Sequence, residues 1–187
     1  AMRFLSKSKL IAFRQCPKRL WLEIHRPELR EDSAGTLASF QVGYQVGDIA
    51  RRIYDPEEKG HVIDVKTEGF DAAFTRSARL LADSAEPIFE AGFKAGGGLA
   101  FADVMLPVIE NGERAWQMVE VKSSTSVKDY HREDVAVQAF IAQAAGVTVK
   151  SVVLACIDSS WVYPGEKDYR GLLAETDLSA ETFARSD

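Results

Sequence analysis

Three charged side chains stand at strand-like spacing on either side of a turn near the middle of the chain. Asp103 lies in one apolar run, and Glu120 and Lys122 lie in the next. The pair Asn111-Gly112 between the runs is typical of a two-residue hairpin turn. Because side chains alternate faces along a strand, Glu120 and Lys122 share a face, and pairing of the runs sets Asp103 beside them. The sequence therefore predicts two carboxylates and an ammonium group converging at a sheet.

This combination suits the metal-dependent hydrolysis of phosphodiester bonds. Mg²⁺ and Mn²⁺ prefer oxygen ligands, which the carboxylates of Asp103 and Glu120 provide. The main-chain carbonyl of Val121 is a candidate third ligand. Lys122 would stand beside the attacking water or the scissile phosphate and stabilise charge there. The alternative is that these residues are exposed charges on an edge strand, with no role in chemistry.

The elements around the hairpin predict an α/β fold with a mixed central sheet and flanking helices. Hydrophobic periodicity predicts the following elements in this part of the chain: a helix over 70–84, strands over 88–93, 99–109 and 115–122, a helix over 129–145 capped by Asp129, and a strand over 151–157. Short strands are expected over 61–66 and 161–163. The order α-β-β-β-α-β gives a sheet with helices on its faces.

Helices also dominate the first sixty residues. We expect one or two helices over 6–24, with Pro17 opening the second, and another over 36–54. Gly43 and Gly47 are one helical turn apart and indicate close packing of that helix on a neighbour. We therefore interpret residues 1–187 as a single domain, with a helical N-terminal extension over 1–60 and a catalytic core over 70–163.

The charge is unevenly distributed along the chain. Residues 1–30, Arg3 included, hold eight Lys/Arg and two acids, whereas the remainder holds 15 Lys/Arg and 26 acids. The basic segment is either a phosphate-binding surface or a solvated helix face. No apolar run is long enough for a membrane span. Two distant cysteines indicate no disulfide framework, so we expect a cytoplasmic protein.

Aromatic side chains of the predicted helices are expected in the core. They are Trp21, Phe40, Tyr44, Phe70, Phe74 and Phe140. Tyr130 and His131, at the start of helix 129–145, remain open as base-stacking and catalytic residues or as surface residues.

The element order, with Asp on the second strand and Glu-x-Lys on the third, resembles the PD-(D/E)XK nuclease superfamily. The chain is most similar to the RecB-like branch, which includes CRISPR-associated exonucleases. The segments VEVKSSTSVKDYHREDVAVQ and LSKSKLIAFRQCPKRLWLE resemble an uncharacterised family of that branch. The resemblance implies a restriction-endonuclease-like core and an Mg²⁺- or Mn²⁺-dependent nuclease acting on DNA. The basic face of residues 3–30 would guide single strands or ends, which are the expected substrates.

The resemblance also implies roles for individual residues. Asp103 and Glu120 match the metal-binding acids, and Lys122 matches the catalytic lysine. Glu90, on the preceding strand, matches an upstream acid near the metal. Gln138, on the following helix, matches the glutamine of a Q-x-x-x-Y motif.

Several positions depart from the family pattern. Ala142 stands where the tyrosine of that motif is expected, and only Gln41 or Gln45 stands where many members carry a metal-binding histidine. Cys16 matches the first cysteine of an iron–sulfur cluster, but Cys156 is the other cysteine of this chain, and such clusters need four thiolates. We therefore expect no cluster within this chain and a small, buried Cys16. The departures leave open an inactive nucleic-acid-binding module, or a fragment of a longer iron–sulfur nuclease.

Overall fold

A computed structural model describes residues 4–185 and shows a mixed α/β fold built on one seven-stranded sheet. Arg3, counted in the basic segment, lies outside the described residues. In chain order the elements are β1 (Leu5–Ser6), α1 (Lys7–Gln15), α2 (Pro17–His25), η1 (Pro27–Leu29), α3 (Ala34–Tyr54), β2 (His61–Val62), α4 (Val65–Glu68), α5 (Phe70–Asp83), β3 (Ile88–Ala95), β4 (Gly98–Glu110), β5 (Glu113–Lys122), α6 (Asp129–Ala144), β6 (Val149–Ile157), β7 (Leu173–Asp177) and α7 (Ser179–Ala184).

The sheet runs in the order β2-β3-β4-β5-β6-β7, and β1 pairs in parallel with the start of β4. Strands β3, β4 and β5 are antiparallel neighbours, whereas β5 and β6 are parallel and are joined through α6. A parallel pair needs such a crossover connection. The predicted α-β-β-β-α-β order and the α/β class are therefore confirmed, with element ends within a few residues of those expected.

The hairpin of β4 and β5 turns at the predicted Asn-Gly pair. Asn111 and Gly112 have φ angles of 51° and 78°, the positive values that a two-residue turn of type I′ requires. The ladder runs from Glu110↔Glu113 to Val104↔Val119 and then stops. Beyond that point β5 continues beside β6, and β4 continues beside β3 and β1. The two strands thus separate immediately before Asp103 on β4 and Glu120 on β5, the two predicted metal-binding acids.

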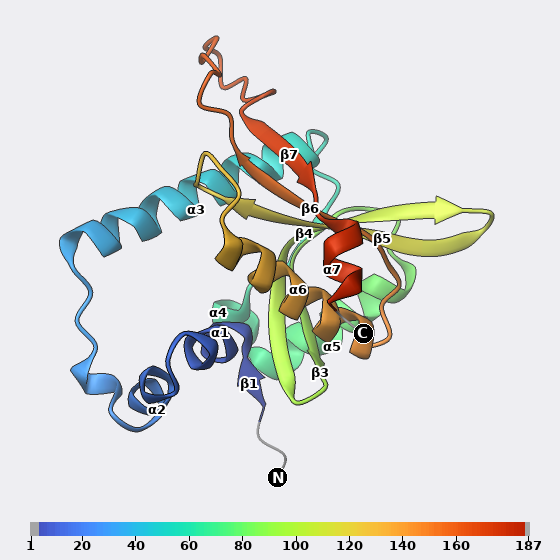
Figure 1. The fold of residues 1–187 in the computed structure, drawn as a ribbon. Helices are drawn as coiled ribbons and strands as arrows, with labels where there is room; N and C mark the ends of the chain where they lie inside the picture. Colours follow the sequence, from blue (N-terminus) through green and yellow to red (C-terminus); the bar gives the residue numbers. More distant parts are fainter. Residues whose placement is uncertain (1–3, 186–187) are drawn as a thin grey trace.

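Hydrophobic side chains cover the two faces of the sheet unequally. The larger core lies under α5 and α6 and contains Met118 of β5, while a smaller core contains Val119. The smaller core packs against Tyr54 at the end of α3. Figure 1 shows the first half of α3 reaching beyond the sheet, where an extended segment joins it to α2. None of the helices in residues 4–185 is long and apolar enough to cross a membrane.

The N-terminal helices form as predicted. The Ser6 side chain caps α1, and Pro17 begins α2 after a break at Cys16. A proline at the first helical position loses no hydrogen bond. Cys16 itself is exposed, so the expectation of a buried thiol is wrong, because the break between the helices turns it outward.

Three predictions about local structure are wrong at the strand and helix ends. Residues 161–163 form no strand; they belong to a loop in which the Trp161 ring lies near Tyr163 and Tyr169. The predicted strand over 61–66 is two residues long and gives way to α4, whose cap is Asp64. The N-cap of α6 is Lys128 rather than the predicted Asp129, which is the first residue of the helix.

The predicted burial of aromatic side chains is also wrong. Only Phe74 is partly buried, while the others are exposed: Trp21, Phe40, Tyr44, Phe70 and Phe140. For the N-terminal helices the reason is that α2 and the first half of α3 lie away from the sheet. Close packing at Gly43 and Gly47 is absent as well, because a Cβ atom at either position would have no neighbour within 4 Å.

Candidate active site

Glu120 and Lys122 lie on the same face of β5, as their spacing predicted. The Lys122 ammonium is 3.4 Å from Glu120 Oε1 and donates to Asp134 Oδ2 at 2.8 Å. Asp134 comes from α6, which covers this face. Glu120 is almost fully buried, with 3% of its surface exposed, so its charge depends on these partners.

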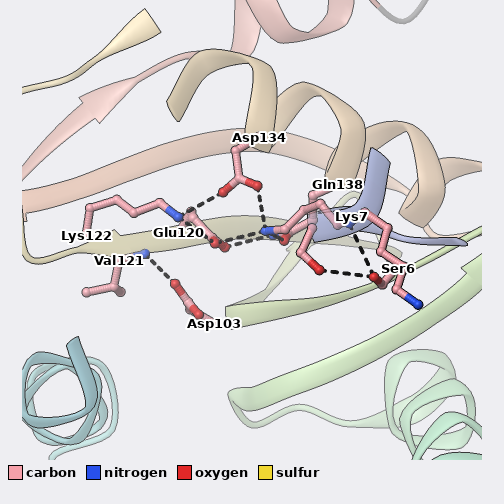
Figure 2. A network of polar contacts seen from close by, with 10 residues as sticks. Ser6, Lys7, Asp103, Glu120, Val121, Lys122, Asp134 and Gln138 are labelled. Carbon is pink, nitrogen blue, oxygen red and sulfur yellow. Dashed lines mark hydrogen bonds and ion pairs between the residues drawn. The ribbon is translucent and has the colours of Figure 1, made fainter. Parts of the chain in front are cut away.

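A second lysine, which sequence reasoning missed, enters the same cluster. Lys7, the first residue of α1, is 3.2 Å from Glu120 Oε1 and 3.1 Å from Asp134 Oδ1. It also donates to Gln138 Oε1 at 2.7 Å. Figure 2 shows its ammonium enclosed by these three side chains. Asp134 lies four residues before Gln138, on the same side of α6, and that spacing was the available signal for Asp134.

The fully buried Gln138 connects Lys7 to Glu120. Its Nε2 donates to Glu120 Oε2 at 2.9 Å, while its Oε1 accepts from Lys7. The amide thus satisfies one carboxylate oxygen and one ammonium hydrogen at once. Gln138 therefore orients Glu120 from within the protein.

Asp103 lies at the point where β4 and β5 separate. Its Oδ2 accepts the Val121 N–H at 2.7 Å, so the side chain replaces the missing partner of the ladder. In Figure 2 it lies on the other side of β5 from Lys7 and Asp134. This side borders a cleft of about 540 Å³ between the sheet and α3.

Glu90 lines the same cleft from β3. It is half-buried and has a φ of 59°, a left-handed conformation that non-glycine residues rarely adopt. Its neighbours Phe89 and Ala91 still pair with β4. The twisted residue thus interrupts the sheet opposite Asp103, and both carboxylates border the cleft with Val121.

The pKa shifts divide the acids into two groups. Burial, and then the charges of Glu120 and Glu90, raise the pKa of Asp103 well above its usual value. Burial and Glu120 likewise raise the pKa of Glu90. Burial opposes the charge of Glu120, but Lys7 and Lys122 outweigh it and lower the pKa of Glu120. The carboxylates that border the cleft therefore lack the compensation that Glu120 has.

The pKa values of Lys7 and Lys122 are shifted by the same cluster of charges. Burial disfavours the charge of Lys7, but Glu120 and Asp134 outweigh it, and the pKa of Lys7 is raised. The pKa of Lys122 is raised by the same two acids against the effect of burial. Both ammonium groups are therefore charged throughout the physiological range.

His131 has a structural role at the start of α6. The ring is buried, and its Nδ1 accepts the Lys128 N–H at 3.0 Å, which satisfies a free donor at the helix start. Burial lowers the pKa of His131. Tyr130 is exposed, with its ring 4.4 Å from that of His131. His131 is thus neither a surface residue nor directed into the cleft.

The positions that depart from the family pattern lie in different surroundings. Gln41 and Gln45 are exposed on α3. Ala142 is fully buried in the core under α6, so the tyrosine of the Q-x-x-x-Y pattern has no space here. Cys156 is buried on β6, and burial raises the pKa of its thiol.

Ala142→Tyr is expected to destabilise the protein by about 3 kcal/mol, because a ring must be forced into a filled core. Chemical denaturation measures this change as a fall in the midpoint. Ala144→Tyr, at an exposed position on the same helix, should leave the midpoint nearly unchanged. An Ala142→Tyr protein as stable as the wild type would show that α6 packs less tightly than described.

The donor set around Asp103 suits a hard divalent cation, although the ligands are not gathered in advance. Among residues 4–185, no group of three or more His, Cys, Asp or Glu side chains is arranged to hold a metal ion. Asp103 and Glu90 still offer oxygens beside the cleft. Burial and the neighbouring acids raise their pKa values, and a bound cation would offset both effects on the carboxylate form. Mg²⁺ accepts a few carboxylates and keeps several waters, so a partly formed site fits it.

Comparisons with known proteins add little to this description. No family model matches the chain, and no curated protein matches it. A solved structure described as "Crystal structure of SSO0001" is similar over 100% of this chain and 74% of that chain, with a TM-score of 0.44 and 11% sequence identity. The functional argument therefore depends on the site itself.

Proposed function

We propose that this chain is a nuclease that hydrolyses phosphodiester bonds in DNA and depends on Mg²⁺ or Mn²⁺. The observation that carries the proposal is the placement of Glu120 and Lys122 on β5, with Asp103 beside them where β4 and β5 separate. An open cleft borders this point. The resemblance of the sequence to RecB-like PD-(D/E)XK nucleases supports the same reading.

Two acids that border the cleft, Asp103 and Glu90, and the buried Glu120 would hold the cation. Asp103 and Glu120 would be the primary ligands, Glu90 a further one, and the carbonyl of Val121 is a candidate fourth. When bound, Mg²⁺ or Mn²⁺ would stabilise charge that develops on the phosphate and lower the pKa of water in the site. Gln138 would act through Glu120, by holding its orientation.

Lys122 would supply the fixed positive charge of the reaction. Glu120 and Asp134 fix the position of its ammonium and leave a third N–H that would donate to a phosphate oxygen. A preorganised donor of this kind stabilises charge as it develops in the transition state.

The cleft offers a path for a DNA strand. Its α3 side presents the exposed rings of Phe40 and Tyr44, together with Arg51. Aromatic rings stack on bases, and cationic groups follow the phosphates of single strands. Lys9 and Lys18 of the basic segment have no ion pair within the described residues, so they remain free for phosphates, and binding should weaken as salt rises.

The test is metal-dependent cleavage of labelled single- and double-stranded DNA by the wild type and by Lys122→Met. We expect cleavage with Mn²⁺ or Mg²⁺, none in EDTA, and a loss of about a hundredfold in the variant. Lys150→Met removes a lysine at an exposed position on β6 and should cleave like the wild type. Equal rates for wild type and Lys122→Met, or no cleavage with any divalent metal, would refute the proposal.

One observation favours a second candidate, a catalytically inactive nucleic-acid-binding module. Glu120 is already neutralised by two ammonium groups, Lys7 and Lys122. A site balanced in this way is stable without metal. DNA binding that is the same in EDTA and in Mn²⁺, with no cleavage in either, would select this candidate.

A further inference from the structure

Three side chains hold the ammonium group of Lys7 in place. Its three donors meet Glu120, Asp134 and Gln138 at 2.7 to 3.2 Å, and 17% of its side chain is exposed. The backbone on its N-terminal side is fixed too, because Leu5 and Ser6 pair with β4 and Ser6 caps α1. The ammonium therefore reaches the acids from an element that lies well before the proposed catalytic core of residues 70–163 in the sequence.

The charges around Lys7 form a closed, neutral group. The two lysines, Lys7 and Lys122, balance the two acids, Glu120 and Asp134. Asp103 and Glu90 lie outside this group and border the cleft. The negative charge that attracts a cation is therefore at the cleft, whereas the buried side of the cluster is already satisfied.

Glu120 links the two sides electrostatically, because its charge raises the pKa of both Asp103 and Glu90. Its Oε1 accepts from Lys7 and Lys122, and its Oε2 accepts from Gln138. A divalent cation beside Asp103 that also binds Glu120 must compete with these donors for the carboxylate oxygens, and it weakens their hydrogen bonds to Glu120. The lysine that leaves most readily is Lys7, because Asp134 and Gln138 still satisfy it.

We propose that Lys7 is a resident counter-ion that competes with the divalent cation for Glu120 and thereby weakens metal binding. This inference rests on the proposed function, because it requires Asp103 and Glu120 to share a cation. It makes the N-terminal segment a control element: any partner or substrate that shifts β1 and α1 withdraws Lys7 and tightens the metal site.

The test is calorimetric titration of Mn²⁺ into DNA-free wild type, Lys7→Met and Lys7→Gln. Removing a positive charge this close to a ligand should tighten binding about tenfold. The same variants should unfold at a lower temperature in EDTA, and Mn²⁺ should raise their melting temperature by more than it raises that of the wild type. Lys150→Met, which removes the same charge at an exposed position on β6, should bind like the wild type.

The outcomes separate the inference from the proposed function. If the wild type binds Mn²⁺ and both Lys7 variants bind equally or more weakly, Lys7 positions Glu120 and the competition is refuted, while the nuclease proposal stands. If only the Lys7 variants bind, the competition is supported and the wild-type chain is not a metal enzyme by itself. If no protein binds, both ideas are overturned.

Discussion

Asp103→Asn is expected to abolish metal-dependent cleavage and, at the same time, to stabilise the metal-free protein. Under the proposed function cleavage should fall about a thousandfold, because the proposed carboxylate ligand would be lost together with the charge stabilisation that a bound cation would provide. The fold should survive, since an asparagine oxygen can still accept the Val121 N–H that Asp103 accepts at 2.7 Å. Loss of activity therefore would not reflect unfolding.

The gain in stability follows from the charge that asparagine removes. Asp103 lies near Glu120 and Glu90, and these neighbours together with burial raise its pKa. A carboxylate whose pKa is raised on folding destabilises the folded state at neutral pH. The substitution should add about 1 kcal/mol to the free energy of unfolding, or roughly 2–4 °C in melting temperature for a chain of this length.

The pH dependence of this gain has a defined sign. As pH falls through the raised pKa of Asp103, the folded wild type takes up a proton that the unfolded chain does not yet bind. The penalty disappears below the unfolded value of 3.8. The difference in melting temperature between Asp103→Asn and the wild type, measured in EDTA, should therefore shrink as the pH is lowered from 7.

A matched control uses an acid away from the site. Asp83→Asn, exposed at the end of α5, should change neither cleavage nor the pH profile. If Asp103→Asn cleaves like the wild type, Asp103 does not bind the catalytic cation. If the variant is less stable at pH 7, the carboxylate is better compensated than the contacts indicate.

The parts of the fold that sequence predicted are those with strong local signals. The hairpin follows from Asn111-Gly112, and helix α6 and strand β6 follow from periodicity within single segments. Strand β7 has no such signal. Four of its five residues, 174–177, are exposed, and its place depends on backbone pairing with β6. A polar edge strand of this kind cannot be distinguished from a loop by composition.

The same limit applies to the candidate site. Glu120, Lys122 and Asp103 share one hairpin, so alternation places Glu120 and Lys122 on one face of β5, and the turn places Asp103 on the neighbouring strand, where it meets the Val121 N–H. Lys7 meets Glu120 across a separation of 113 residues, and the pairing of β1 with β4 and the Arg14–Glu133 ion pair between α1 and α6 position it. The exposed rings on α3 were misjudged for a related reason. An apolar stripe at helical spacing predicts a face, but not whether the sheet reaches far enough to cover it.

Substitution of two glycines of α3 is expected to change both stability and cleavage. Gly43 and Gly47 border the cleft beside Asp103, and a Cβ atom at either position would meet no atom within 4 Å. Glycine inside a helix costs roughly 1 kcal/mol relative to alanine. Under the proposed function, the open space beside the two glycines leaves room for a DNA strand close to the helix.

Replacing both glycines with leucine should therefore raise stability and reduce cleavage together. The helix gains intrinsic propensity, so the melting temperature should rise by several degrees, while the side chains fill the cleft and should cut cleavage about a hundredfold by displacing the DNA strand. Thermal unfolding and the cleavage assay measure the two effects on the same preparation. Mn²⁺ affinity in the absence of DNA should stay within about twofold, because neither glycine supplies a ligand.

Two further variants separate filling of the cleft from effects on the helix. The double alanine variant gains the same helix propensity but adds only a methyl group at each position, so it should be stabilised and remain largely active. Ala38→Leu enlarges an exposed residue of α3 that does not border the cleft and should leave cleavage unchanged. Full activity in the double leucine variant would place the DNA elsewhere, because a strand cannot share the cleft beside Asp103 with two leucine side chains.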